Sequence, residues 1–141
     1  MPESFALRLA TPEEVLLEEQ VVSLRAPAVE GQLGVLAGHA PMVAELTVGE
    51  LVVTEQSGSA RYFSTTGGAL RVERDGVTVL ADAAEEADGI DVERARSALE
   101  RARERLRRPW AAPDVDSLRA ELALARALNR LEVAARVGGR G

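Results

Sequence analysis

The chain has 141 residues, of which 46% are hydrophobic and only 3% aromatic, and its formal net charge is −6. This length suits one ordinary domain, or a compact domain with an appendage, and excludes a large multidomain enzyme. The absence of cysteine excludes disulfides and thiolate metal sites, and the single histidine, His39, excludes a histidine cluster. No apolar run reaches the roughly 20 residues of a membrane span, so we expect membrane contact only through a partner.

Residues 1 to 82 are expected to form short strands separated by turns. Phe5, Leu7 and Leu9 alternate with Ala6 and Arg8, which is the two-residue period of a half-buried strand. Glycines recur at near-regular spacing over the same stretch, and frequent turns between short strands are typical of a β-sandwich, here of up to about ten strands. The sequence Arg74-Asp75-Gly76-Val77 predicts a hairpin.

The period becomes helical at Asp91, which is a plausible helix cap. The apolar stripe of this helix consists of Ala95, Ala98, Leu99, Ala102 and Leu106. Residues 91 to 141 hold 12 Arg against 8 acidic residues, whereas residues 1 to 90 hold 5 Arg against 15. Arginines flank the stripe on both sides, and glutamates occupy the back of the helix. The arginines therefore form either a contact surface for a partner or a solvated face with ion pairs along the helix.

A second helix is predicted after a break at Pro109 to Pro113, with Asp114 or Asp116 as its cap. Its apolar residues fall in two stripes, the first made of Leu118, Leu122 and Ala125, the second of Leu124, Leu128, Leu131 and Ala135. Two apolar faces require two packing partners, so one face is expected to contact the first helix and the other the sheet or another protein. Residues 91 to 136 are therefore predicted to form an antiparallel helical hairpin.

Arg126 and Arg130 are four residues apart, so a helix places both guanidinium groups on one face, where they can bind polyphosphate oxygens. Packing of the two helices would add Arg94. Ile90 and Ala95 offer an apolar wall for adenine, and a carboxylate can accept from the base or the ribose. No P-loop is present, so binding without hydrolysis is expected. The alternative interpretation is that Asp91 only caps its helix and the arginines pair with acids.

Three segments together resemble one family along nearly the whole chain: EGQLGVLAGHAP at Glu30 to Pro41, TGGALRVERDGVTVLADAAE at Thr66 to Glu85, and IDVERARSALERARERL leading to RAELALARALNRL. The chain resembles the epsilon subunit of bacterial F-type ATP synthase, of the ATP-binding type. The resemblance implies an α+β fold, with a ten-stranded β-sandwich at residues 1–84 and an antiparallel two-helix hairpin at residues 85–141. It also implies a peripheral place on the cytoplasmic face of the bacterial cell membrane.

The resemblance implies an ATP site at the start of the first helix. The family pattern is Ile or Leu, Asp, two variable residues, Arg, Ala, and the chain matches it from Ile90 to Ala95. An acid before the helix and two arginines on the second helix accompany the pattern. The implied ATP-binding residues are Glu85, Ile90, Asp91, Arg94, Ala95, Arg126 and Arg130. ATP would be a regulatory ligand that is not hydrolysed and needs no metal.

The resemblance also implies contacts with other subunits. The sandwich would bind the gamma subunit and the c-ring, with Glu30, Gly31, Gln32, Leu33, Gly34 and His39 at that interface. The first helix would contact the alpha and beta subunits and inhibit ATP hydrolysis through Arg101, Arg103, Arg105, Arg107 and Arg108. His39 has no nucleophile partner in its motif, so a turn or interface role is favoured over acid-base chemistry.

The predicted function is that of a non-catalytic central-stalk subunit that couples rotation and inhibits ATP hydrolysis. When the ATP concentration falls, the two helices would separate and extend toward the catalytic subunits. The alternative function is that of an arginine-rich nucleic-acid-binding module. The negative net charge of the chain and the scarcity of aromatic residues disfavour this alternative. A stand-alone enzyme is disfavoured because no nucleophile and base occur in a recognisable spacing.

Overall fold

The computed structural model describes residues 3–108 and 114–138, with side chains described to Arg108 and then from Ser117 to Val137. The chain divides into two compact units, Met1–Glu86 and Ala87–Gly141. The first unit contains all the strands of the described residues, and the second contains the helices. The expected break at Pro109 to Pro113 and the side chains of Asp114 and Asp116 lie outside the described part.

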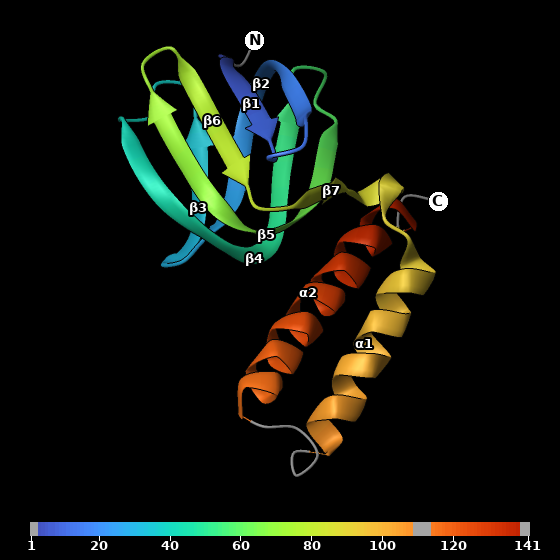
Figure 1. The fold of residues 1–141 in the computed structure, drawn as a ribbon. Helices are drawn as coiled ribbons and strands as arrows, with labels where there is room; N and C mark the ends of the chain where they lie inside the picture. The colour runs from blue at the N-terminus through green and yellow to red at the C-terminus, as the bar shows by residue number, and fades with distance from the viewer. Residues whose placement is uncertain (1–2, 109–113, 139–141) are drawn as a thin grey trace. The chain divides into compact units, whose positions relative to one another are not determined.

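The first unit is a β-sandwich whose sheet closes on itself (Figure 1). The strands are β1 Phe5–Ala10, β2 Val15–Ala28, β3 Gly31–Leu36, β4 Met42–Glu55, β5 Ala60–Glu73, β6 Gly76–Ala81 and β7 Ala84–Glu86. Their order in the sheet is β1-β6-β5-β4-β2-β3, and β7 pairs with β5. The sheet closes because β1 pairs with both β6, in parallel, and β2, antiparallel.

Ten strands were expected, but the described residues form seven. The difference comes from β2, β4 and β5, each of which runs for 14 residues. The register shifts between Val21 and Ser23 and between Arg25 and Ala28, where β2 pairs with β4. Such irregularities bend a strand without ending it, so the turn-like residues along these stretches do not all mark strand ends.

The core of the first unit follows the alternation that the sequence predicts. Leu7 and Leu9 are buried, and Phe5 packs against the same cluster. The Arg74-Asp75 hairpin is also confirmed, because Glu73 of β5 pairs with Gly76 of β6. Gly76 has a φ of +155°, and a Cβ there would lie 2.9 Å from the carbonyl oxygen of Ala6, so glycine is required for the close approach of β1.

The second unit consists of the 3-10 helix η1 Ala87–Gly89, α1 Val92–Arg107 and α2 Asp114–Gly138. The predicted cap is confirmed, since Asp91 Oδ1 accepts a hydrogen bond of 3.1 Å from the backbone N–H of Arg94. The two helices lie side by side (Figure 1). The α1 residues Ala95, Leu99 and Ala102 are buried, as are Ala120, Ala127 and Val133 of α2.

One predicted stripe of α2 has no packing partner among the described residues. Leu118 and Leu122 were expected to face the first helix, the sheet or another protein, and they are 59% and 44% exposed. Ala120 and Ala123 of the same helix line a pocket together with residues of α1. Small side chains on the facing sides of two helices allow the backbones to approach closely, and here the alanines take the place that the pattern gave to leucines.

Candidate functional site

The start of α1 presents its predicted site residues in different environments. Asp91 is exposed and caps the helix, whereas Ile90 is 8% exposed and Ala95 is fully buried. Ala95 therefore contributes to packing in this conformation and does not offer an open apolar wall. Glu85 belongs to the first unit, where it lies in β7 opposite Ser64 of β5.

Two of the three predicted phosphate-binding arginines have no carboxylate partner among the described residues. Arg94 and Arg126 are exposed and form no side-chain ion pair within 3–108 and 117–137, whereas Arg130 is half-buried and engaged in an interaction. Arg94 is one turn from Ala98 on α1, and Arg126 is about one turn from Ala123 on α2. Ala98 and Ala123 line the same pocket. Arg94 and Arg126 therefore each lie about one helical turn from a residue of that pocket.

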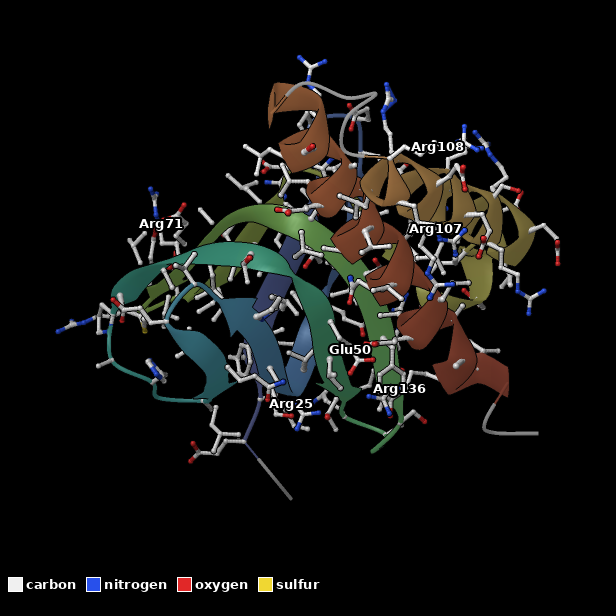
Figure 2. The ribbon with its side chains drawn as sticks, turned by 90° about the horizontal axis from the view of Figure 1, so that it is seen from below. Arg25, Glu50, Arg71, Arg107, Arg108 and Arg136 are labelled. Atoms are coloured by element: carbon white, nitrogen blue, oxygen red, sulfur yellow. The ribbon has the colours of Figure 1, made fainter. Side chains whose placement is uncertain are left out.

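The arginines along α1 divide into two groups. One group pairs with glutamates of the same helix: Arg96 with Glu93 at 2.9 Å, Arg103 with Glu100 at 3.2 Å, and Arg107 and Arg108 with Glu104 at 3.4 and 2.9 Å. Figure 2 shows Arg107 and Arg108 among the side chains of α1. Three of the five predicted inhibitory arginines therefore form ion pairs along the helix in the isolated chain. Exposed pairs of this kind are worth only about 0.3–0.5 kcal/mol each, so a partner can replace them at small cost.

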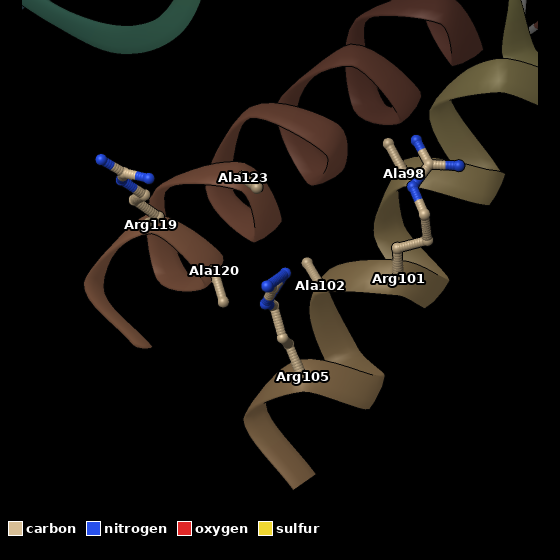
Figure 3. A pocket seen from close by; sticks show the side chains of 7 residues that line it. All are labelled: Ala98, Arg101, Ala102, Arg105, Arg119, Ala120 and Ala123. Carbon is tan, nitrogen blue, oxygen red and sulfur yellow. The ribbon is translucent and has the colours of Figure 1, made fainter. Parts of the chain in front are cut away.

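The second group lines a pocket of about 300 Å³ between α1 and α2 (Figure 3). Its lining residues are Ala98, Arg101, Ala102, Arg105, Arg119, Ala120 and Ala123. Arg119 was missed by the sequence analysis. The signal was present, because Arg119 precedes Arg126 by seven residues, and that spacing places both side chains on one helical face.

The predicted stalk interface lies at two turns of the β-sandwich. Glu30 and Gly31 are exposed at the turn between β2 and β3. Val29 and Val43 are 56% and 68% exposed beside them and line one shallow pocket with them. His39 lies in a separate turn, where its backbone N–H donates to the carbonyl of Leu36 and its Nδ1 lies 2.7 Å from the carbonyl oxygen of Ala40. This geometry supports a turn role for His39.

A half-buried charge cluster surrounds Arg61 in the first unit and was not predicted from the sequence. Arg61 donates from Nε and Nη2 to the two carboxylate oxygens of Glu86, at 2.8 and 2.7 Å. Its Nη1 lies 3.8 Å from both Glu19 and Glu55, and its guanidinium carbon lies 5.6 Å from the centroid of the Phe63 ring. Burial, followed by the proximity of Glu55, raises the pKa of Glu19, and the hydrogen bonds to Glu86 raise the pKa of Arg61.

No metal centre or membrane helix occurs in the part of the chain that the structure describes. Within residues 3–108 and 114–138, no three His, Cys, Asp or Glu residues are grouped to hold an ion. None of the helices described there is long and apolar enough to cross a bilayer.

Comparisons with known proteins agree over both units. Residues 4–87 match the β-sandwich domain of the ATP synthase delta/epsilon chain, and residues 88–135 match its long α-helix domain. The ATP synthase epsilon chain of Desulforamulus reducens is 42% identical over 134 residues, covering 95% of this chain and 99% of that protein. The epsilon chain of Bacillus pumilus is 45% identical over 128 residues, covering 91% and 95%.

Solved structures give the same assignment. A chain of the mitochondrial ATP synthase of Euglena gracilis, from its OSCP/F1/c-ring assembly, is 30% identical. It superimposes with a TM-score of 0.82, covering 95% of this chain and 82% of that one. The protein therefore belongs to the family of ATP synthase epsilon chains, which are non-catalytic subunits of the central stalk.

Proposed function

We propose that this subunit senses ATP through its helical unit and inhibits ATP hydrolysis when ATP is scarce. The observation that carries the proposal is the separation of the arginines on α1. Arg94 lies in the family pattern at Ile90 to Ala95 and has no carboxylate partner among the described residues, whereas Arg96 next to it pairs with Glu93. An exposed arginine without a counterion is available for a phosphate.

In the proposed ATP-bound state, α1 and α2 form an antiparallel hairpin with the triphosphate between Arg94, Arg126 and Arg130. The three guanidinium groups compensate the phosphate charge without a metal ion. Adenine would lie beside Ile90 and Ala95, which are buried in the present structure, so ATP binding would require the helices to shift. Asp91 supplies a carboxylate that accepts from the base or the ribose.

ATP would control the subunit by stabilising only the closed hairpin. A ligand that binds one state stabilises it by RT ln(1 + [L]/Kd), which is about 2.7 kcal/mol at a hundredfold excess over Kd. In the extended state, Arg101, Arg103, Arg105, Arg107 and Arg108 would contact acidic segments of the beta subunits. Arg103, Arg107 and Arg108 would give up their weak ion pairs with Glu100 and Glu104 to form these contacts, at little cost in free energy.

Residues 1–84 are proposed to attach the subunit to gamma and to the c-ring. The exposed apolar side chains of Val29 and Val43 beside Glu30 to Gly34 support a contact surface at this end of the sandwich. The Euglena relative comes from an assembly that includes the c-ring. Attachment through these partners would hold the subunit at the cytoplasmic face of the membrane.

Calorimetric titration of the full chain with ATP in EDTA tests the ATP site. We expect one-to-one binding, and we expect Arg126→Ala to weaken it by about tenfold or more, since a hydrogen bond to a charged group contributes about 1.5–3 kcal/mol. Arg96→Ala is the matched control, because Arg96 already pairs with Glu93. Absence of binding by the unaltered chain, or equal loss in both variants, would overturn the proposed site.

A further inference from the structure

The strand β7 is the last element of the first unit, and the chain passes from its end directly into the second unit at Ala87. It has three residues, all half-buried, which pair with Phe63 to Thr65 of β5. Strands in globular proteins usually have about five or six residues. The backbone pairing of β7 is therefore short, and contacts made by its side chains contribute much of what holds it on β5.

Arg61 supplies such a contact at the end of β7. Arg61 and Phe63 are two residues apart on β5 and share one face, and Glu86 of β7 pairs opposite Phe63. Arg61 and Glu86 are thus diagonal neighbours across the two strands. The guanidinium donates from Nε and Nη2 to both carboxylate oxygens of Glu86, at 2.8 and 2.7 Å, which is the strong two-bond geometry of an arginine–carboxylate pair.

Two further carboxylates stand ready to receive Arg61 if Glu86 leaves. Nη1 of Arg61 lies 3.8 Å from Glu19 of β2 and 3.8 Å from Glu55 of β4. A half-buried cation that loses its partner is costly, but Arg61 would keep a counterion by turning to these residues. While Glu86 is in place, three carboxylates share one cation and repel one another. Both effects make the contact between Arg61 and Glu86 easier to open.

We propose that the Arg61–Glu86 pair is a releasable clamp on the strand that leads into the helical unit. While the clamp is closed, any movement of the helical unit relative to the sandwich must occur at residues after Glu86. Opening it frees the three residues of β7, which adds about 10 Å of extended chain to the connection. A greater reach for α1 is the consequence that rests on the proposed extension of the helices, whereas the clamp itself does not.

Hydrogen exchange of the full chain at neutral pH, followed by mass spectrometry, measures the opening of β7. Arg61→Gln removes the two charge-assisted hydrogen bonds, so we expect the amides of residues 84–86 to exchange about tenfold faster or more. The amides of β6 should be unaffected, because local opening does not require global unfolding. Arg71→Gln is the matched control on the same strand. Its exposed pair with Glu73, at 3.5 Å, is weak, so exchange in β7 should change by less than about twofold.

Glu86→Gln is a second variant, which weakens the clamp and leaves Arg61 compensated by Glu19 and Glu55. It should also speed exchange in β7 without changing exchange in β6, even where the loss of Arg61 destabilises the whole unit. Unchanged exchange of residues 84–86 in Glu86→Gln, or an equal acceleration in β6, would overturn the clamp.

Glu55→Gln separates a releasable clamp from a fixed structural contact. It removes one carboxylate that receives Arg61 in the open state and one that repels Glu86 in the closed state, so exchange in β7 should become about twofold slower or more. If Glu55 only stabilised the folded strands through Arg61, the same change would speed exchange, and that result would contradict the proposal. Failure of the ATP titration would leave these expectations unaltered, so the clamp and the proposed function are tested separately.

Discussion

Arg61 shows how one residue can organise the end of the β-sandwich. Its guanidinium joins β5 to Glu86 of β7 by two hydrogen bonds and lies near Glu19 of β2 and Glu55 of β4. One positive charge therefore faces three carboxylates from three strands. Since a single cation cannot compensate all three, the carboxylate with the weakest contact is left least favourably placed.

Glu19 and Glu55 both lie 3.8 Å from Arg61, and the pKa of Glu19 is the one that rises, which predicts a pH dependence of stability. Burial and the neighbouring Glu55 raise the pKa of Glu19 above 4.5 in the folded protein. Between 4.5 and the raised value the folded state binds more protons than the unfolded state, so the free energy of unfolding falls as pH rises through this window. Above this window the ionised Glu19 is destabilising, and there we expect Glu19→Gln to increase the free energy of unfolding.

Urea denaturation of the full chain at pH 4 to 8 measures this effect. At neutral pH, the free energy of unfolding of Glu19→Gln should exceed that of the unaltered chain. In the acidic window, the free energy of unfolding of Glu19→Gln should not fall as pH rises. Glu18→Gln is the control, because Glu18 is the exposed neighbour on the same strand. A lower stability of Glu19→Gln at pH 7 would show that its contact with Arg61 outweighs burial.

At the level of elements, the close pairing of β5 and β6 depends on Gly68. This residue has a φ of +132°, and a Cβ there would meet the carbonyl oxygen of Leu80 and the Cα of Ala81. Both atoms belong to backbone and cannot move aside independently. We expect Gly68→Ala to lower the free energy of unfolding by about 2 kcal/mol or more, through backbone strain and overpacking.

Thermal denaturation followed by circular dichroism tests the Gly68 prediction. Gly34→Ala is the matched control, since a Cβ at Gly34 meets no heavy atom within 4 Å. Its melting temperature should stay close to that of the unaltered chain. Equal melting temperatures for both variants would mean that β5 and β6 can separate at this point without loss of stability.

The sequence predicted those elements whose signals are local. Asp91 was recognised as a cap because its chemistry involves only the next three residues. Leu7 and Leu9 were recognised because a strand repeats every two residues. The Arg61 cluster was not predictable, since Arg61 and Glu86 are 25 residues apart and meet only after β7 pairs with β5. The seven-residue spacing of Arg119 and Arg126 predicts that they share a helical face, but the sequence does not say which face of α2 meets α1.

The whole molecule combines an acidic β-sandwich with an arginine-rich helical unit. Residues 91 to 141 hold 12 of the 17 basic residues, and all the described arginines of α1 except Arg94, Arg101 and Arg105 are paired within the helix. The Arg–Glu ion pairs of α1 are exposed and weak. Its arginines can therefore exchange their glutamates for an acidic surface of a partner. This arrangement suits a unit that would alternate between two sets of contacts.

The proposed inhibitory role can be measured only in the assembled ATP synthase. Replacing Arg101, Arg103, Arg105, Arg107 and Arg108 together with Gln removes the positive charge through which α1 would contact the catalytic subunits. We expect ATP hydrolysis at low ATP to rise several-fold, because long-range attraction and the final contact are both lost. Under the proposed mechanism, saturating ATP would already release the unaltered complex from inhibition, so the two complexes should then hydrolyse ATP at similar rates.

A control complex carrying Arg71→Gln and Arg74→Gln separates this effect from a general loss of charge. Both arginines are exposed and belong to the first unit, whereas the proposed inhibitory helix belongs to the second. Hydrolysis by the control should remain inhibited at low ATP, and raising the salt concentration should weaken the inhibition of the unaltered complex, because salt screens exposed charges. Unchanged inhibition in the five-residue variant would rule out the arginines of α1 as the inhibitory contact and direct the search to the exposed leucines of α2.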